Sequence, residues 1–197
     1  MKTIYFLALS LCLLMTSCLS DAVDEIDQNA SVKNLIVNFK SFNIDSLVTP
    51  DIEFKDDKSK YHLYLSLKLD IENTKSSTAK SQGIATSMVV NQIEDEAISL
   101  PLEPFTIEGN SKQVETALSD INFETHSQAV KYILEQAVNE SPIESSIAFS
   151  LLFEQIGSSE QRQLALPAVS PSIATKGKVP QKTLTAFQVI LNSKILD

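Results

Sequence analysis

The sequence predicts an all-β fold, an antiparallel β-sandwich or barrel with one inserted helix. Short segments that alternate apolar and polar residues recur at roughly 8 to 14 residue spacing. A single segment, about 125–140, has the period of a helix instead. Residues 19–197 contain no cysteine, so the folded body must rely on an apolar core rather than on disulfides or cysteine-bound metal. The chain has 197 residues, 43% of them hydrophobic, which suits one domain of this kind.

The first 17 residues have the order of a secretory signal. Lys2 supplies a positive charge, an apolar run covers 4–15, and the small polar pair Thr16-Ser17 follows. The apolar run is shorter than the about 20 residues that a transmembrane helix needs. We therefore expect residues 1–17 to be a signal peptide.

The end of this segment, "LMTSC", resembles a bacterial lipoprotein signal. The resemblance implies cleavage between Ser17 and Cys18, diacylglycerol on the Cys18 thiol, and an acyl chain such as palmitate on the new amino terminus. An ordinary signal peptide with a chance cysteine and a retained transmembrane anchor are the alternatives. Leu19 after the cysteine favours the outer membrane, facing the periplasm, in a cell that has one.

Residues 18–31 are expected to form an acidic tether between the lipid and the folded domain. The stretch has four carboxylates and no basic residue, which is typical of a solvated linker. The alternative is the first turn of a helix. The expected domain follows at 32–180, with a C-terminal extension at 181–197.

Apolar and polar residues alternate along 33–56, with one change of phase. The apolar positions before and after Lys40-Ser41 are out of phase, so a β-bulge is expected there. The sequence "TPD" at 49–51 interrupts the run, and Ile52 and Phe54 are expected to resume it. The next strand, 61–72, is the most regular, and its apolar side suits the inner face of a sheet. That side consists of Tyr61, Leu63, Leu65, Leu67, Leu69 and Ile71.

Several shorter strands follow the polar stop at Asn73. They are marked by alternation at Ile84–Val90, Ile98–Leu102, Phe105–Ile107, Val114–Leu118, Ile147–Phe153 and Leu164–Leu166, with a short final strand between Ile173 and Val179.

The expected helix within 125–140 carries one apolar stripe, with Thr125 and Gln128 in a capping-box pattern and Pro142 limiting its end. The tail 181–197 fits both a strand and a helix, and we favour a helix packed on the body.

Residue types that carry out catalysis are scarce. Of the two histidines, His62 lies on the polar face of its strand and His126 in the first helical turn. Both are interpreted as ordinary surface or capping residues. The chain lacks the nucleophile-elbow, phosphate-loop and zinc-helix patterns, and no cofactor or metal is expected. Acidic runs at 55–58 and 94–96 and the tyrosines Tyr61, Tyr64 and Tyr132 leave weak alternatives: an acid pair, a calcium site or a carbohydrate platform. A net charge of -9 argues against nucleic-acid binding.

The order of these elements resembles the LEA14-like family, also called late embryogenesis abundant (LEA) type 2 or the water-stress and hypersensitive-response domain. A long alternating strand ends in "DIENTKSS", an "LPLEPFTI" segment follows, a lone helix precedes two late strands, and the segment closes on "KGKVP", Lys176–Pro180. Family members have Asn-Pro-Asn where this chain keeps Asn73. The match covers about 33–180.

The resemblance implies an immunoglobulin-like or fibronectin-III-like sandwich with one helix, a stress-related role and no catalytic centre. We therefore expect a non-catalytic, lipid-anchored cell-envelope protein that protects or scaffolds other components. A partner-binding assembly module of an envelope complex, with an envelope protein as its partner, is the alternative, and an envelope hydrolase using clustered carboxylates is the weaker one.

Overall fold

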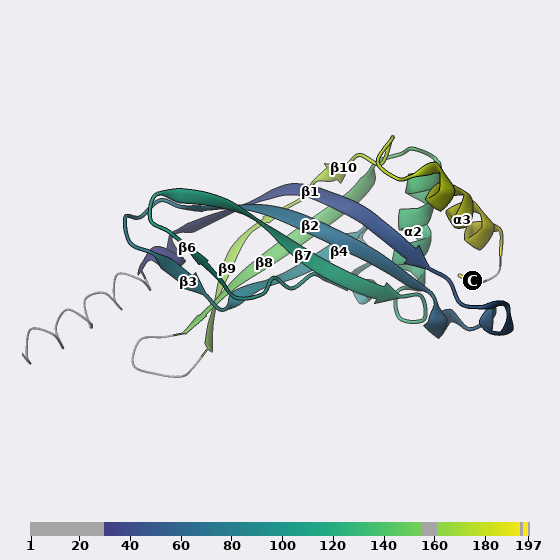
Figure 1. Ribbon diagram of the computed structural model, residues 1–197, viewed down its shortest axis with the longest axis horizontal. Coiled ribbons are helices and arrows are strands. Elements are labelled where there is room, and N and C mark those ends of the chain that lie inside the picture. The colour runs from purple at the N-terminus through teal and green to yellow at the C-terminus, as the bar shows by residue number, and fades with distance from the viewer. Residues whose placement is uncertain (1–29, 155–160, 194, 197) are drawn as a thin grey trace, which may run out of the picture.

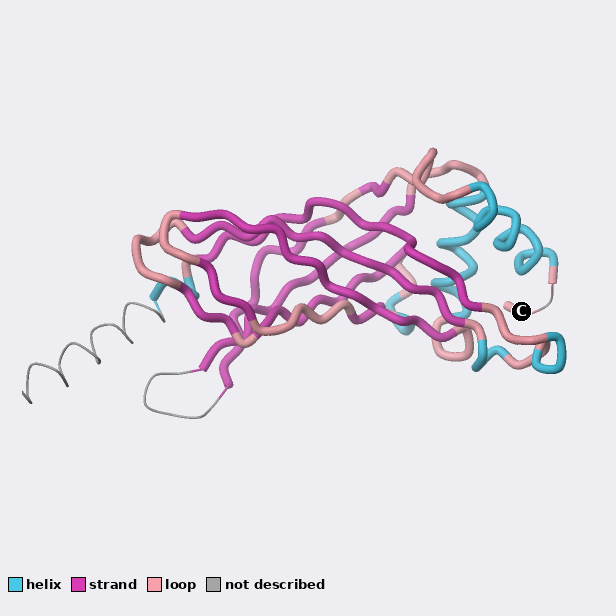
Figure 2. The backbone as a smooth tube through the Cα atoms, in the orientation of Figure 1, coloured by secondary structure: helices cyan, strands magenta, loops and turns pink. Residues whose placement is uncertain are grey.

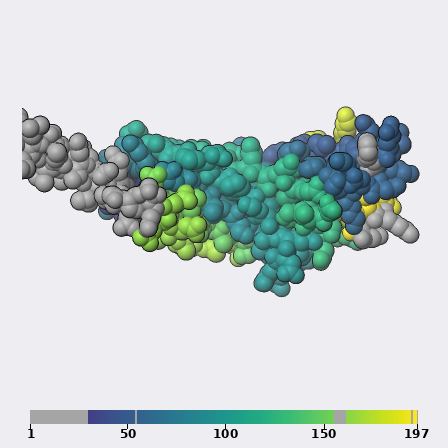
Figure 3. Space-filling model, turned by 90° about the horizontal axis from the view of Figure 1, so that it is seen from below, coloured from purple at the N-terminus to yellow at the C-terminus, as the bar shows by residue number. Residues whose placement is uncertain are grey.

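Two antiparallel sheets face each other in an elongated body. A computed structural model describes residues 30–154, 161–193 and 195–196. The ribbon shows the sheets layered face to face, and the helices gather at one end (Figures 1 and 2). The view from below shows the same elongated outline (Figure 3). The predicted all-β sandwich is confirmed.

The first sheet contains three long strands in the order β1-β2-β7. They are β1 (Leu35–Val48), β2 (His62–Asn73) and β7 (Ser111–Asn122). Strand β2 is central and pairs along its full length with β7, without a register shift. The most regular alternation in the sequence therefore forms the middle of the sheet.

The second sheet is built around β8, which pairs with β4, β9 and β10, and β4 pairs in turn with β5. A separate two-stranded ribbon, β3 with β6, lies at the end away from the helices (Figure 1). The bounds are β3 (Ala79–Ser81), β4 (Gly83–Val90), β5 (Ile98–Ser99), β6 (Phe105–Ile107), β8 (Ile143–Glu154), β9 (Gln161–Val169) and β10 (Ser172–Ile173).

The core lies between the sheets and is supplied by every second residue of their strands. The β2 row from Leu63 to Ile71 is at most 1% exposed. It belongs to the same hydrophobic cluster as the inner residues of β4 and β8. Each buried leucine or isoleucine stabilises the fold by about 1.5–3 kcal/mol relative to exposure.

The bulge predicted in β1 is confirmed. Its pairing with β2 skips from Phe39 to Ser41, which leaves Lys40 as the extra residue. The skip returns Phe42 to the inner face, where it is 3% exposed. A second register shift, between Ile44 and Ser46, was not predicted.

Strand β7 has its apolar residues on the unexpected face. Alternation alone would place Val114, Thr116 and Leu118 on the core side, but Val114 is 48% and Leu118 65% exposed. Ala117 and Ile121 face the core instead. The register with β2 imposes this, because Ala117 lies opposite the buried Leu67.

Two other expectations are wrong. Ile52 and Phe54 lie in a 3-10 turn, η1 (Ile52–Phe54), and not in a strand, so Ile52 is 87% exposed. Pairing of β10 with β8 stops at Ile173, so no strand reaches Val179. Strand β9 continues through Pro167, which is tolerated because a register shift lies there.

Helices α2 (Ser127–Val138) and α3 (Gln181–Asn192) pack together at one end, and residue 30 lies at the opposite end (Figure 1). Both predicted helices are present. The predicted capping box is wrong, because the Thr125 hydroxyl donates to Asn122 O. The carboxylate of Glu96, from the 3-10 turn η3 (Glu94–Glu96), accepts the N–H of Ala129 at 2.8 Å. It thereby provides a partner for one of the N–H groups in the first turn of α2 that have no partner within the helix.

One buried polar atom suggests a stabilising substitution. Thr86 Oγ1, on the inner side of β4, has no hydrogen-bond partner among the described residues. Valine has nearly the same shape and no hydroxyl, so Thr86→Val should raise the free energy of unfolding by about 1 kcal/mol. Urea denaturation measures this, with the exposed Thr106→Val on β6 as the control. A loss of stability in Thr86→Val would show that the hydroxyl has a partner, such as a bound water.

Candidate functional site

The predicted lipidation site, Ser17-Cys18, lies outside the described residues, which begin at residue 30. Within the described part, no helix is both long and apolar enough to cross a membrane.

A histidine–aspartate pair lies on the outer face of the first sheet. His62 Nδ1 is 2.7 Å from Asp120 Oδ1. Their side chains are 31% and 44% exposed. The two residues are 58 positions apart and come together because β2 and β7 pair in a register that sequence patterns do not specify. The interpretation of His62 as an ordinary surface or capping residue did not include this contact.

The other side of the imidazole faces an amide. Asn122 Nδ2 lies 3.5 Å from His62 Nε2 and donates to Ser59 O at 2.7 Å. A histidine held by a carboxylate acts as a general base when a nucleophile faces its second nitrogen. Here the Asn122 amide occupies that position. The cluster therefore fastens the 3-10 turn η2 (Lys58–Lys60) to the sheet.

The acidic run at 55–58 lies next to this cluster, and its Asp57 side chain forms hydrogen bonds with a residue only two positions away. The hydroxyl and backbone N–H of Ser59 both donate to Asp57, at 2.6 and 3.0 Å. The hydroxyl hydrogen bond is the main cause that holds the pKa of Asp57 below its usual value. In the part of the chain that the structure describes, no three or more His, Cys, Asp or Glu side chains come together in a way that could hold a metal ion.

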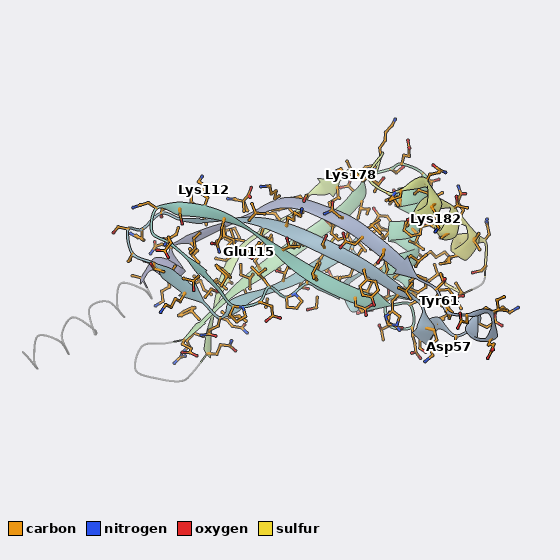
Figure 4. All side chains as sticks on the ribbon, in the orientation of Figure 1. Asp57, Tyr61, Lys112, Glu115, Lys178 and Lys182 are labelled. Carbon is orange, nitrogen blue, oxygen red and sulfur yellow. The ribbon has the colours of Figure 1, made fainter. Side chains whose placement is uncertain are left out.

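The tyrosines differ in their availability for stacking. Tyr61 is 8% exposed, stacks on Phe123 with ring centroids 5.4 Å apart, and donates to Lys55 O (Figure 4). Burial is the main cause that raises its pKa. Tyr132 accepts the backbone N–H of Glu144. Tyr64 is exposed and lies beside His62, and the charge of Asp120 is the main cause that raises its pKa.

Two carboxylates border a hollow of about 740 Å³ where β4 and β8 approach η3. Glu94 and Glu144 are among its lining residues, and Glu144 Oε1 accepts the hydroxyl of Ser172 at 2.6 Å. Asn91 and Gln92 in the adjoining turn have φ values of 47° and 61°, a left-handed conformation that asparagine tolerates better than glutamine. A smaller hollow of about 350 Å³ on the first sheet is also lined by two carboxylates, Asp70 and Glu72.

The second histidine, His126, is the residue before the first turn of α2. Its Nδ1 lies 2.8 Å from the Thr125 hydroxyl, and its backbone carbonyl accepts the N–H of Val130. His126 thus occupies the N-cap position of α2, but its side chain makes no capping hydrogen bond.

Asn73, the last residue of β2, connects several turns through its side chain. Asn73 is 1% exposed. Its Nδ2 lies 2.8, 3.3 and 3.2 Å from the carbonyl oxygens of Ser77, Ile107 and Glu108. Its Oδ1 accepts the N–H of Lys75 at 3.0 Å. One side chain therefore closes its own turn and ties that turn to the connection between β6 and β7.

Gly109 allows the connection between β6 and β7 to pack closely against the turn at 73–77. A Cβ at this position would lie 1.9 Å from Ser76 O, closer than any real contact. The start of the described chain contacts the same turn, because the hydroxyls of Ser31 and Ser77 lie 2.5 Å apart. The turn at 73–77 is thus the point where the chain enters the sandwich.

No protein-family model matches the sequence, and no curated protein matches it either. Three solved structures are similar in part. A crystal structure of a protein from Archaeoglobus fulgidus is 11% identical, with a TM-score of 0.39, over 71% of this chain and 98% of that one. The X-ray structure of the structural-genomics target SoR45 is 11% identical, with a TM-score of 0.42, over 74% and 89%. The solution structure of AT1g01470 from Arabidopsis thaliana is 7% identical, with a TM-score of 0.39, over 73% and 89%. At these values the likenesses carry no weight for function.

Removal of the Asn73 amide should destabilise the domain. Asn73→Ala leaves buried carbonyls and the Lys75 N–H without their partner, at a cost of about 1–3 kcal/mol. Asn73→Asp should cost at least as much, because a carboxylate would face three carbonyl oxygens. Urea denaturation measures both. Asn38→Ala, at an exposed position of β1, is the control. Equal stability of Asn73→Ala and the control would contradict the role of Asn73.

Replacement of Asp120 should change one tyrosine titration and leave another unchanged. Without the Asp120 charge, the pKa of Tyr64 should fall towards the ordinary tyrosine value in Asp120→Asn. The pKa of Tyr61 should stay raised, because burial is its main cause. NMR titration of the tyrosine ring carbons reports both groups in one sample. A Tyr64 pKa that does not move would rule out the assigned cause.

Proposed function

We propose that this chain is a non-catalytic, lipid-anchored cell-envelope protein with a LEA14-like domain, and that it scaffolds or protects other envelope components. The observation that carries the proposal is the lipoprotein-like signal "LMTSC" at the start of a chain that enters its folded body at one end. The favoured location is the outer membrane, facing the periplasm.

The arrangement of the body supports an anchored role. Residues 30–33 are helical, and Ser31 and Val32 are 0% and 1% exposed at the end opposite α2 and α3 (Figure 1). The segment from Cys18 to Ser31 can reach at most about 45 Å when fully extended. An acylated Cys18 would therefore keep this end of the body within about 45 Å of the membrane.

Two features support the family assignment within this proposal. Asn73 lies in the turn where the family has Asn-Pro-Asn, and its amide contacts give that asparagine a structural role. In "KGKVP", Gly177 has φ of 66°, a left-handed conformation that favours glycine, and α3 begins directly after Pro180. Both residues thus have a physical reason to occupy their positions.

The assembly-module alternative is favoured by exposed apolar side chains on the outer face of the first sheet. They come from β1, where two of them lie at opposite ends of the strand, and from β7, where the other two lie four residues apart. They are Ile36, Val48, Val114 and Leu118, between 44% and 65% exposed. Crosslinking in cells should then give one dominant envelope protein rather than a diffuse set.

Lipid attachment is tested with the two cysteines of the chain. An alkyne-tagged palmitate fed to cells should label the full chain and Cys12→Ala, whereas Cys18→Ala should stay unlabelled and keep residues 1–17. Cys12→Ala is the matched control, because it removes the other cysteine of the signal segment. Two acyl chains or more are needed for stable anchoring. Membrane release of Cys18→Ala is therefore measured in parallel, and label in that variant would exclude this anchor.

A further inference from the structure

The two edges of the first sheet differ in how they are protected. Strand β1 has a bulge at each of its register shifts, near Lys40 and Asp45, and bulges with charged residues hinder the pairing of an edge with another strand. Strand β7 pairs with β2 over 12 residues without a shift. It is also the last strand of its sheet, so its other side forms an uninterrupted edge. Strands β5 and β6 come near β7, but they pair with β4 and β3.

The hydrogen-bond pattern shows which residues face this edge. The N–H of Phe123 donates to Tyr61 O, so Tyr61 and Phe123 form a hydrogen-bonded pair. Along an antiparallel ladder such pairs recur at every second residue. The odd-numbered residues of β7 therefore direct their backbone groups to β2. The even-numbered residues direct theirs to the open edge, and their side chains lie on the outer face of the sheet.

When two copies of β7 are placed side by side and antiparallel, the even-numbered side chains of one copy can face side chains of opposite charge or shared apolar character on the other. In an antiparallel pair of two β7 strands centred on Thr116, Lys112 lies opposite Asp120 and Val114 lies opposite Leu118. On the inner face, Glu115 lies opposite Ala117. A shift that centres the pair on Glu115 would place two Glu115 carboxylates opposite each other, which is unfavourable.

We propose that two copies of this chain pair edge to edge through β7, antiparallel, with the two Thr116 residues at the symmetry axis. Exposure of the residues agrees with this: Val114 is 48% and Leu118 65% exposed, and the side chains of Lys112 and Asp120 are 71% and 44% exposed. Lys112 lies near the start of β7 and contacts Glu72 of its own chain at 2.6 Å (Figure 4). Each dimer would contain two Lys112–Asp120 pairs and two Val114–Leu118 pairs, in one continuous six-stranded sheet.

The first experiment places a single thiol at the axis. Cells expressing full-length Thr116→Cys are treated with a short bifunctional maleimide, and the product is identified by mass spectrometry. A dimer of the chain is expected for Thr116→Cys. It is not expected for Asn38→Cys, an exposed position of the opposite edge strand, or for the parent chain, which controls for Cys12 and Cys18. A crosslink to a different protein, or no crosslink, would overturn the proposal.

The second experiment tests the register by exchange of charge. Lys112→Asp should raise the dissociation constant of the detergent-solubilised dimer about tenfold or more, because two like-charged pairs replace two opposite ones. Lys112→Asp combined with Asp120→Lys should restore dimerisation, and sedimentation measures each form. Glu72→Gln removes the intrachain partner of Lys112 and should leave the dimer intact. Failure of the double exchange to restore the dimer, or dissociation in Glu72→Gln, would overturn this register.

Discussion

The burial of one row of side chains on β2 determines most of this structure. Leu63 to Ile71 on the inner face are removed from water, and a slip of one residue would turn that row to the solvent. The register with both neighbouring strands is therefore fixed. In β1 the apolar residues fall out of phase, and the bulge at Lys40 corrects them. In β7 the same constraint turns Val114 and Leu118 outward, although they are more apolar than the inner residues Gln113 and Glu115.

Several polar side chains form hydrogen bonds at the points where strands and helices of this body end. Asn73 joins the turns at the end where the chain enters, and Asn122 with His62 joins η2 to the other end. Glu96 completes the start of α2. Buried or half-buried backbone groups need partners wherever ladders stop. Short polar side chains supply these partners, and this need explains why such residues cluster just outside the regular alternation.

Local patterns predicted the elements well and their contacts poorly. Alternation identified β2 and β4, phase slippage identified the bulge in β1, and a 3.6-residue period identified α2. These signals depend on neighbours in the sequence. The face of β7, the His62–Asp120 pair and the Glu96 cap depend on residues far apart in the chain, so pairing register decides them. Ile52 was misjudged because its apolar character suggested a strand where "TPD" and the following charges favour a turn.

The entry of the chain at one end of β1 has a mechanical consequence. The helical turn at residues 30–33 leads into β1, whose long axis follows the length of the body (Figure 1). Antiparallel hydrogen bonds run perpendicular to their strands. A force that pulls the N-terminal segment away from the helical end would therefore load the bonds between β1 and β2 together, in shear, rather than opening them one after another. A body loaded in this way resists tension along its length.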